Sequence, residues 1–264
     1  MADGWRLFWR TVGVFAYRDL TIQYRTLYRG LAWFLVQQAL YVGLFAVFLE
    51  GIFGRGRTAE AGAAPYWLYV YSGIVIWQFF AKAISRAMTS LTDQRAILSR
   101  VRVSVPAIPV AAVAACTVEL AVSLVMLAIA LAATGAGQID AAQIFTGILA
   151  LLLFCICTAA IGMLLAVANV WIEELRHVFP VLLQLWFFLT PVVYFPDAAP
   201  EALRWVFKIN PVSEFLEVFR SIALSSSQID GKFGLFALCG AAYVVVSAGI
   251  SYLAFREASL SDRL

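Results

Sequence analysis

Charged residues are scarce in this chain. Only 13% of its 264 residues are charged, whereas 63% are hydrophobic and the mean hydropathy is +0.87. Soluble domains carry about 25% charged residues. No polar stretch is long enough to form a soluble domain of its own. The composition therefore excludes an ordinary soluble protein and predicts a membrane protein that crosses the bilayer several times.

The residues that catalysis, ATP binding and metal binding require are missing as well. The only histidine is His177, no lysine lies in a glycine-rich turn, and the P-loop pattern is absent. Neither H-E-x-x-H nor G-x-S-x-G occurs. The four cysteines lie inside apolar runs, as small hydrophobic residues do. We expect no enzyme activity, no metal site and no nucleic-acid partner.

Six segments are long and apolar enough to cross a membrane, which takes about 20 residues. They are Leu31–Phe53, Pro65–Ile84, Val105–Ala133, Ala141–Val170, Val178–Tyr194 and Phe233–Phe255. Six spans place both termini on one side, and most Lys and Arg residues fall on that side. The positive-inside rule therefore predicts an all-α membrane protein with cytoplasmic N and C termini.

Prolines interrupt the chain near the end of the fifth predicted span and beyond it, at Pro191, Pro196, Pro200 and Pro211. A further crossing here would bury several charges, at about 2.5–3.5 kcal/mol for each Arg or Lys. Two short helices fit better, with Pro200 in the first turn of one and Asn210 capping the other ahead of Pro211 and Glu214. We predict a re-entrant pair that dips into the outer leaflet and closes a pore. The alternative is an amphipathic hairpin lying flat on the surface.

Two cytoplasmic elements are predicted. Residues 5–16 place Trp5, Trp9 and other apolar residues on one helical face, which suits a helix in the membrane interface or one packed on the protein. In the loop between the second and third spans, Thr92 or Asp93 can cap a short helix that ends near Arg100. A soluble partner can push on such a helix, although an ordinary basic loop is the simpler interpretation.

Glu119 lies near the middle of the third span. Carboxylates inside membranes are costly and indicate function by default. Two interpretations stay open: a structural pair with a polar group of a neighbouring helix, or a role in the pore or in conformational coupling. No second acidic residue or histidine in mid-span completes a proton relay.

Two mixed stripes of rings, amides and hydroxyls recur at helical spacing. They comprise Trp33, Gln37, Tyr41 and Phe45 in the first span, and Trp186, Thr190 and Tyr194 in the fifth. Sugars present C–H faces and hydroxyls together, so such stripes suit a carbohydrate path. Interfacial anchoring by Trp and Tyr is the alternative.

Four blocks in this order carry a resemblance to a known family. They read RDLTIQYRTLYRGLAWFLVQQAL, YSGIVIWQFFAKAISRAMTSLTDQRAILSRVRVSVPAIPV, NVWIEELRHVFPVLLQLWFFLTPVVYFP and KINPVSEFLEVFR. The chain resembles the membrane subunit of type-two ABC exporters, in particular the permeases that export O-antigen, capsule and teichoic acid. One departure stands after NVWI, where the family commonly shows Arg-Asp and this chain has Glu173 and Glu174.

The resemblance implies a homodimer in the bacterial inner membrane, joined by two ATP-binding cassette subunits that bind ATP and Mg²⁺. This chain would hold no cofactor. The substrate would be a lipid-linked polysaccharide, and lipids would surround the spans. Export of a drug or small lipid-like molecule, and ion-coupled transport through Glu119, are the alternatives.

The resemblance also assigns roles to residues. The two stripes would line the path. The periplasmic gate would include Pro191, Pro196, Pro200, Asn210, Pro211 and Arg220, and the ATPase contacts would include Trp5, Arg6, Asp93, Gln94, Arg95 and Arg100. We expect one domain, with 1–30 as the interface helix, 31–194 as spans one to five, 195–230 as the gate, 231–256 as the sixth span and 257–264 as the tail.

Overall fold

The computed structural model describes residues 2–23, 33–41, 43–44, 47, 65–98, 103–135, 140–196, 204–224, 240–241, 243–245, 247 and 249. These residues form helices joined by turns and contain no strand. The helices are α1 (Ala2–Gln23), α3 (Tyr66–Asp93), α4 (Arg95–Leu98), α5 (Ala107–Thr134), α6 (Ala141–Trp171), α7 (Leu175–Phe188), α8 (Arg204–Ile209) and α9 (Pro211–Ala223). The all-α prediction is confirmed for this part of the chain.

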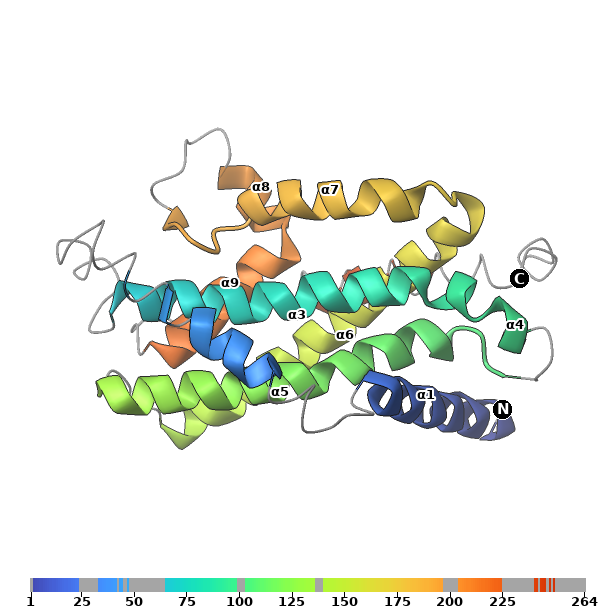
Figure 1. The fold of residues 1–264 in the computed structure, drawn as a ribbon, viewed down its shortest axis with the longest axis horizontal. Helices are drawn as coiled ribbons and strands as arrows, with labels where there is room; N and C mark the ends of the chain where they lie inside the picture. Colours follow the sequence, from blue (N-terminus) through green and yellow to red (C-terminus); the bar gives the residue numbers. More distant parts are fainter. Residues whose placement is uncertain are drawn as a thin grey trace.

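Three helices are long and apolar enough to cross a membrane: α3, α5 and α6, with 28, 28 and 31 residues. They run along the long axis of the molecule (Figure 1). At about 1.5 Å per residue each exceeds the roughly 30 Å hydrocarbon layer. The predicted first span is described only in part and the sixth lies largely outside the described residues, although residues 33–41 and the described positions between 240 and 249 are helical. The count of six spans stays a prediction.

Local signals mark the ends of the long helices. Gly135 follows α5 with a φ of 66°, the left-handed conformation that favours glycine at a helix end. Asp140 precedes α6 and forms a capping box with Gln143, whose Oε1 accepts from the Asp140 backbone N–H at 3.0 Å. These two caps turn the chain back, so α5 and α6 are antiparallel neighbours.

α3 differs from the prediction at its C-terminal end. It continues to Asp93 instead of ending near Ile84, because Ala87, Met88 and Leu91 extend its buried face. Thr92 and Asp93 therefore belong to its last turn, and the predicted cap of a helix ending near Arg100 is wrong. α4 spans only Arg95–Leu98, and Arg100 lies outside the described residues.

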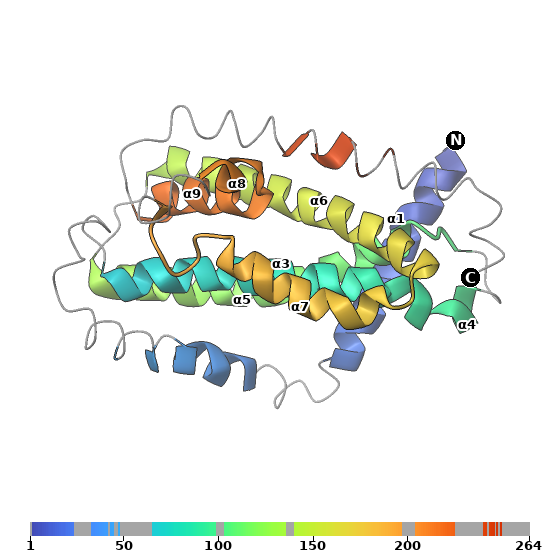
Figure 2. The same ribbon diagram turned by 90° about the horizontal axis from the view of Figure 1, so that it is seen from above.

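α3 lies at the centre of the bundle. α5 and α7 lie alongside it, and α6, α8 and α9 lie together next to these three helices (Figure 2). Most of α3 is buried, and rings from α6 and α9 complete the core, where Phe154 stacks on Phe215 at 4.1 Å between centroids. Gly162 of α6 lets the backbone approach α3, since a Cβ there would lie 2.7 Å from the Cβ of Ala87.

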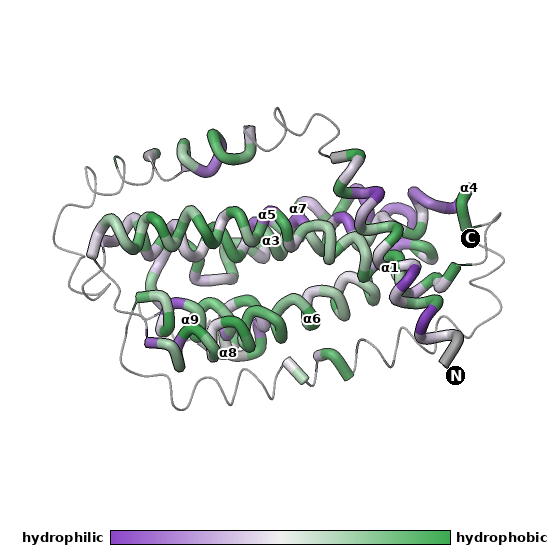
Figure 3. Tube along the Cα trace, turned by 90° about the horizontal axis from the view of Figure 1, so that it is seen from below, coloured by the Kyte–Doolittle hydropathy of each residue, from purple (hydrophilic) through white to green (hydrophobic). Residues whose placement is uncertain are grey.

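α1 and α4 share one end of the molecule (Figure 1). Hydrophilic residues concentrate at this end, while the long helices are mostly hydrophobic (Figure 3). Val12 and Phe15 of α1 are buried against α3, α5 and α6, whereas Trp5 and Trp9 are 65% and 51% exposed. Part of the amphipathic face thus packs on the protein, and the two exposed rings leave membrane contact as a prediction for its N-terminal part.

The two short helices predicted after the fifth span are present as α8 and α9. Asn210 caps α9, with its Oδ1 accepting from the Val212 N–H at 3.1 Å, Pro211 at the start and Glu214 in the first turn, as predicted. Most of α9 is buried against α3 and α6, which does not fit a hairpin lying flat on a surface. Its depth in a membrane stays a prediction, and Pro200 lies outside the described residues.

Candidate functional site

Glu119 pairs with Lys82. The Lys82 Nζ lies 2.5 and 2.6 Å from the two carboxylate oxygens. Lys82 is on α3 and Glu119 on α5, each within about 4 Å of the middle of its helix along the axis. The pair therefore lies near the middle of the bundle, and Lys82 belongs to the interior of a span and not to a cytoplasmic loop.

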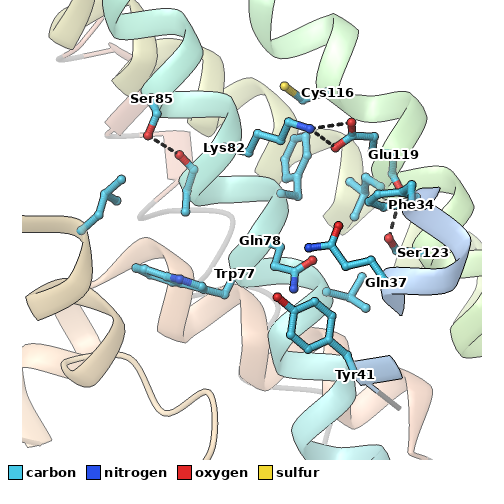
Figure 4. A pocket seen from close by; sticks show the side chains of 15 residues that line it. Phe34, Gln37, Tyr41, Trp77, Gln78, Lys82, Ser85, Cys116, Glu119 and Ser123 are labelled. Carbon is cyan, nitrogen blue, oxygen red and sulfur yellow. Dashed lines mark hydrogen bonds and ion pairs between the residues drawn. The ribbon is translucent and has the colours of Figure 1, made fainter. Parts of the chain in front are cut away.

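This ion pair borders a cavity of about 450 Å³ between α3, α5 and the helical residues 33–41. In Figure 4 the side chains of Gln37, Gln78, Tyr41, Lys82 and Glu119 converge on this space. Rings and aliphatic groups complete the wall: Phe34, Trp77, Phe79, Leu120 and Leu183. The cavity therefore combines polar groups with apolar faces near the middle of α3 and α5, two of the helices long enough to cross a membrane.

α7 ends at Phe188, whereas the predicted fifth span continues to Tyr194. The predicted C-terminal end of this span is therefore wrong. Pro191 has no N–H to continue the helix, and the Thr190 N–H bonds to the Phe187 carbonyl at 3.2 Å in a tighter turn. The helix has 14 residues, about 21 Å, which is too short to cross by itself. We call residues 189–194 the Pro191 turn.

Arg220 of α9 satisfies the open backbone of this turn. Its Nη1 donates to the Pro191 carbonyl at 2.7 Å, and its Nη2 donates to the Val192 carbonyl at 2.6 Å and the Tyr69 carbonyl at 3.2 Å. The guanidinium also stacks 3.6 Å from the centre of the Tyr69 ring. Arg220 is 7% exposed, so these contacts replace its hydration and join α9, α3 and the Pro191 turn.

Asn210 joins the same turn to the start of α9. Its Nδ2 donates to the Thr190 Oγ1 at 2.8 Å, while its Oδ1 accepts from the Trp186 Nε1 at 3.2 Å and from the α9 backbone. Thr190 and Asn210 are buried. The end of α7 and the α8–α9 pair are thus held together by two buried polar side chains, Arg220 and Asn210.

Gly73→Ala is expected to destabilise the protein. A Cβ at Gly73 would clash with the Arg220 Nη2 and lie 2.7 Å from the Val192 carbonyl oxygen, so the guanidinium and the turn must shift. We expect a loss of about 1–3 kcal/mol, measured by denaturant unfolding in mild detergent. Gly13→Ala in α1 is the matched control, because nothing lies within 4 Å of its Cβ. Equal stability of the two variants would contradict the close packing of Arg220.

A second polar cavity, of about 440 Å³, lies where α3 and α4 meet α6 and α7. Arg95 Nη2 lies 3.4 Å from Glu173 Oε1, and Arg176 Nη2 lies 3.6 Å from Asp93 Oδ1. The acidic Glu173, where the resemblance predicted arginine, thus has a basic partner in Arg95. Exposed pairs of this kind contribute about 0–1 kcal/mol each. The two ion pairs fix the orientation of these side chains and add little to the free energy of folding.

Comparison with known proteins identifies the family of this chain. A model of the ABC-2 type transporter family matches residues 10–224. The chain belongs to the ABC-2 type transporter family. It is therefore a multi-pass membrane protein and a transport subunit rather than an enzyme, and the described residues contain no cluster of metal-ligating side chains.

Three relatives of this ABC-2 chain carry the same name. It is 25% identical, over 94% of its own length and 92% of the other, to a protein of Myxococcus xanthus named "O-antigen export system permease protein RfbA". Two proteins of Klebsiella pneumoniae with the same name are 20% and 19% identical, over 79% and 80% of this chain and 78% of each of theirs.

The structure places the predicted path residues of the ABC-2 chain in two separate locations. Gln37 and Tyr41 line the cavity beside Lys82, whereas Trp33 is 67% exposed and Phe45 lies outside the described residues. Trp186 lines a different, mostly apolar cavity of about 470 Å³ with Trp205 and Tyr243. The two stripes do not meet within the described chain, and their role in transport stays a prediction.

The predicted gate and ATPase-contact residues are also placed. Pro191, Asn210, Pro211 and Arg220 gather around the Pro191 turn, which Pro196 follows closely. Trp5, Arg6, Asp93, Gln94 and Arg95 lie at the end that α1 and α4 share. Both roles stay predictions. Three residues that the sequence did not mark are central to these sites: Gly73, Gln78 and Lys82 as the partner of Glu119.

Proposed function

We propose that this chain is the permease subunit of an ATP-driven exporter that moves a lipid-linked polysaccharide, of O-antigen or capsule type, across the bacterial inner membrane. It works as a homodimer with two ATP-binding cassette subunits. One observation carries the proposal: the similarity to a permease named for O-antigen export extends over 94% of this chain. Membership of the ABC-2 family supports the need for a separate ATPase.

The geometry agrees with this assignment at both ends of the bundle. α1 and α4 offer exposed Trp5 and Arg6 and the half-buried Arg95 at the hydrophilic end, where an ATPase subunit can bind. At the opposite end, Arg220 joins the Pro191 turn to α9, most of which is buried. The midplane cavity with rings, amides and hydroxyls lies between the two ends.

Ion-coupled transport through Glu119 has no stronger support in this structure than ATP-driven export. Both carboxylate oxygens are bound by Lys82, at 2.5 and 2.6 Å. The pairing names the partner of Glu119 and does not by itself favour ion coupling. No observation favours a drug or a small lipid-like substrate over a polysaccharide.

Deletion of the gene in its host is expected to remove the polysaccharide from the cell surface and to leave the lipid-linked polymer inside the cell. Lectin or antibody staining of whole and permeabilised cells measures both pools. Replacing the catalytic glutamate of the partner ATPase is expected to give the same result, since hydrolysis drives export. An unchanged surface polysaccharide in the deletion strain would overturn the proposal. Export that persists with the inactive ATPase would point to ion coupling instead.

A further inference from the structure

The Lys82–Glu119 pair faces a cavity instead of being sealed in the core. The Lys82 side chain is 41% exposed, and both residues line the cavity of about 450 Å³. A buried ion pair is often replaceable by apolar residues without loss of stability. Charged residues in the middle of spans commonly mark a transport path. The pair therefore has a use beyond folding.

We propose that this cavity binds one neutral sugar ring of the transported polymer, with Gln37, Gln78, Tyr41 and the Lys82–Glu119 pair supplying its hydrogen bonds. The inference rests on the proposed function and adds a position and a ligand chemistry to it. The indole rings of Trp186 and Trp205 line a different cavity and are not part of this site.

The hydrogen-bonding groups of the cavity suit hydroxyls. Within the described chain, neither the Gln37 amide nor the Tyr41 hydroxyl has a hydrogen-bond partner. Gln78 is oriented by Gln38, whose Nε2 donates to the Gln78 Oε1 at 3.1 Å, while Gln38 in turn accepts from the Tyr71 hydroxyl at 3.4 Å. An amide offers both donor and acceptor atoms, as a pair of neighbouring sugar hydroxyls requires.

The Glu119 carboxylate favours a neutral ligand beside it. The ammonium group of Lys82 is paired with this carboxylate, and the Arg86 guanidinium lies next to Cys116 of the lining. A phosphate or carboxylate group bound here would lie against the carboxylate of Glu119, and like charges repel strongly where water is scarce. A hydroxyl instead donates to the carboxylate or accepts from the ammonium without adding charge.

The walls and the size of the cavity also fit a sugar ring. Phe34 provides an aromatic ring and Leu183 an aliphatic group, which can cover the C–H faces of a sugar. Trp77 and Phe79 also border the cavity, with rings that pack on Phe187 and Phe154. Small-molecule sites usually have volumes of about 300–1,000 Å³ with a few placed polar groups. The volume of about 450 Å³ lies within that range.

Protection of a reporter cysteine tests the site in the purified full-length protein. Ser85 lines the cavity, and its hydroxyl donates to the Ala81 carbonyl of its own helix, so Ser85→Cys preserves the lining. The native cysteines are replaced by alanine. The rate of labelling by a methanethiosulfonate reagent is measured with glucose, galactose, mannose, rhamnose or N-acetylglucosamine. Ser123→Cys gives a second reporter on α5, and Thr21→Cys on exposed α1 is the control.

At least one sugar is expected to slow labelling of Ser85→Cys, about fivefold at a concentration about four times its Kd, and to leave Thr21→Cys unchanged. Gln37→Ala, and the double variant Lys82→Met with Glu119→Gln, are expected to abolish this protection. Three results would each overturn the inference: no sugar protects either reporter, inorganic phosphate protects as well as the sugars, or the double variant is protected like the parent. Failed protection with surface polysaccharide still dependent on the gene would reject the sugar site and leave the proposed function intact.

Discussion

Arg220→Ala is expected to remove most of the folded protein from the membrane. The substitution takes donors away from the buried carbonyls of Pro191 and Val192, and one donor from the Tyr69 carbonyl, which also accepts from the Ser72 hydroxyl. Each buried backbone group left without a partner costs about 1–3 kcal/mol. We expect a loss on the order of 3–5 kcal/mol in unfolding free energy, which is a large part of the stability of a typical domain.

Denaturant unfolding in mild detergent and the amount of protein in isolated membranes measure this effect. Arg10→Ala is the matched control, because Arg10 is exposed on α1 and its loss is expected to change stability by less than about 0.5 kcal/mol. Arg220→Lys is expected to be intermediate, since an ammonium group lacks the planar fork that reaches two carbonyls on one side. If Arg220→Ala unfolded at the same denaturant concentration as Arg10→Ala, Arg220 would not hold the Pro191 turn.

Local rules predicted α9 because its signals are adjacent in the sequence. Asn210, Pro211 and Glu214 stand in the order that begins a helix, and the structure confirms each of them. Pro191 carried the same kind of signal, but its position in an apolar run made it read as part of a span. The carbonyls of Pro191 and Val192 accept hydrogen bonds from Arg220, which lies 29 and 28 residues further along the chain. No local pattern joins residues so distant.

The pairing of Lys82 with Glu119 could not be predicted from the sequence, for a similar reason. Glu119 stood out because one acidic residue interrupted an apolar span. Lys82 did not stand out, because it lies two residues before Ile84, where the predicted second span ends. In the structure α3 continues to Asp93, so Lys82 lies near the middle of the helix. The partner of Glu119 follows only from the register between α3 and α5, which depends on side-chain packing along both helices.

A double-mutant cycle on Lys82 and Glu119 is expected to give the second large effect. Lys82→Met leaves the carboxylate of Glu119 without its ammonium partner at the middle of the bundle, and we expect a loss of about 3 kcal/mol. Glu119→Gln is expected to cost less, because the Lys82 side chain is 41% exposed to the cavity and can move toward water. The double variant is expected to regain most of the stability, since Met and Gln leave no unpaired charge.

The exposed pair Arg95–Glu173 is the matched control for this cycle. Its side chains are 40% and 70% exposed, and its coupling energy is expected to stay below about 1 kcal/mol. For Lys82 and Glu119 we expect a coupling of about 2–3 kcal/mol, at the upper end for residues in direct contact. Purely additive losses would show that the two charges do not interact. A double variant that folds like the parent protein but exports no polysaccharide would separate the two roles of the pair, because its stability would be restored while its hydrogen-bonding groups would be gone.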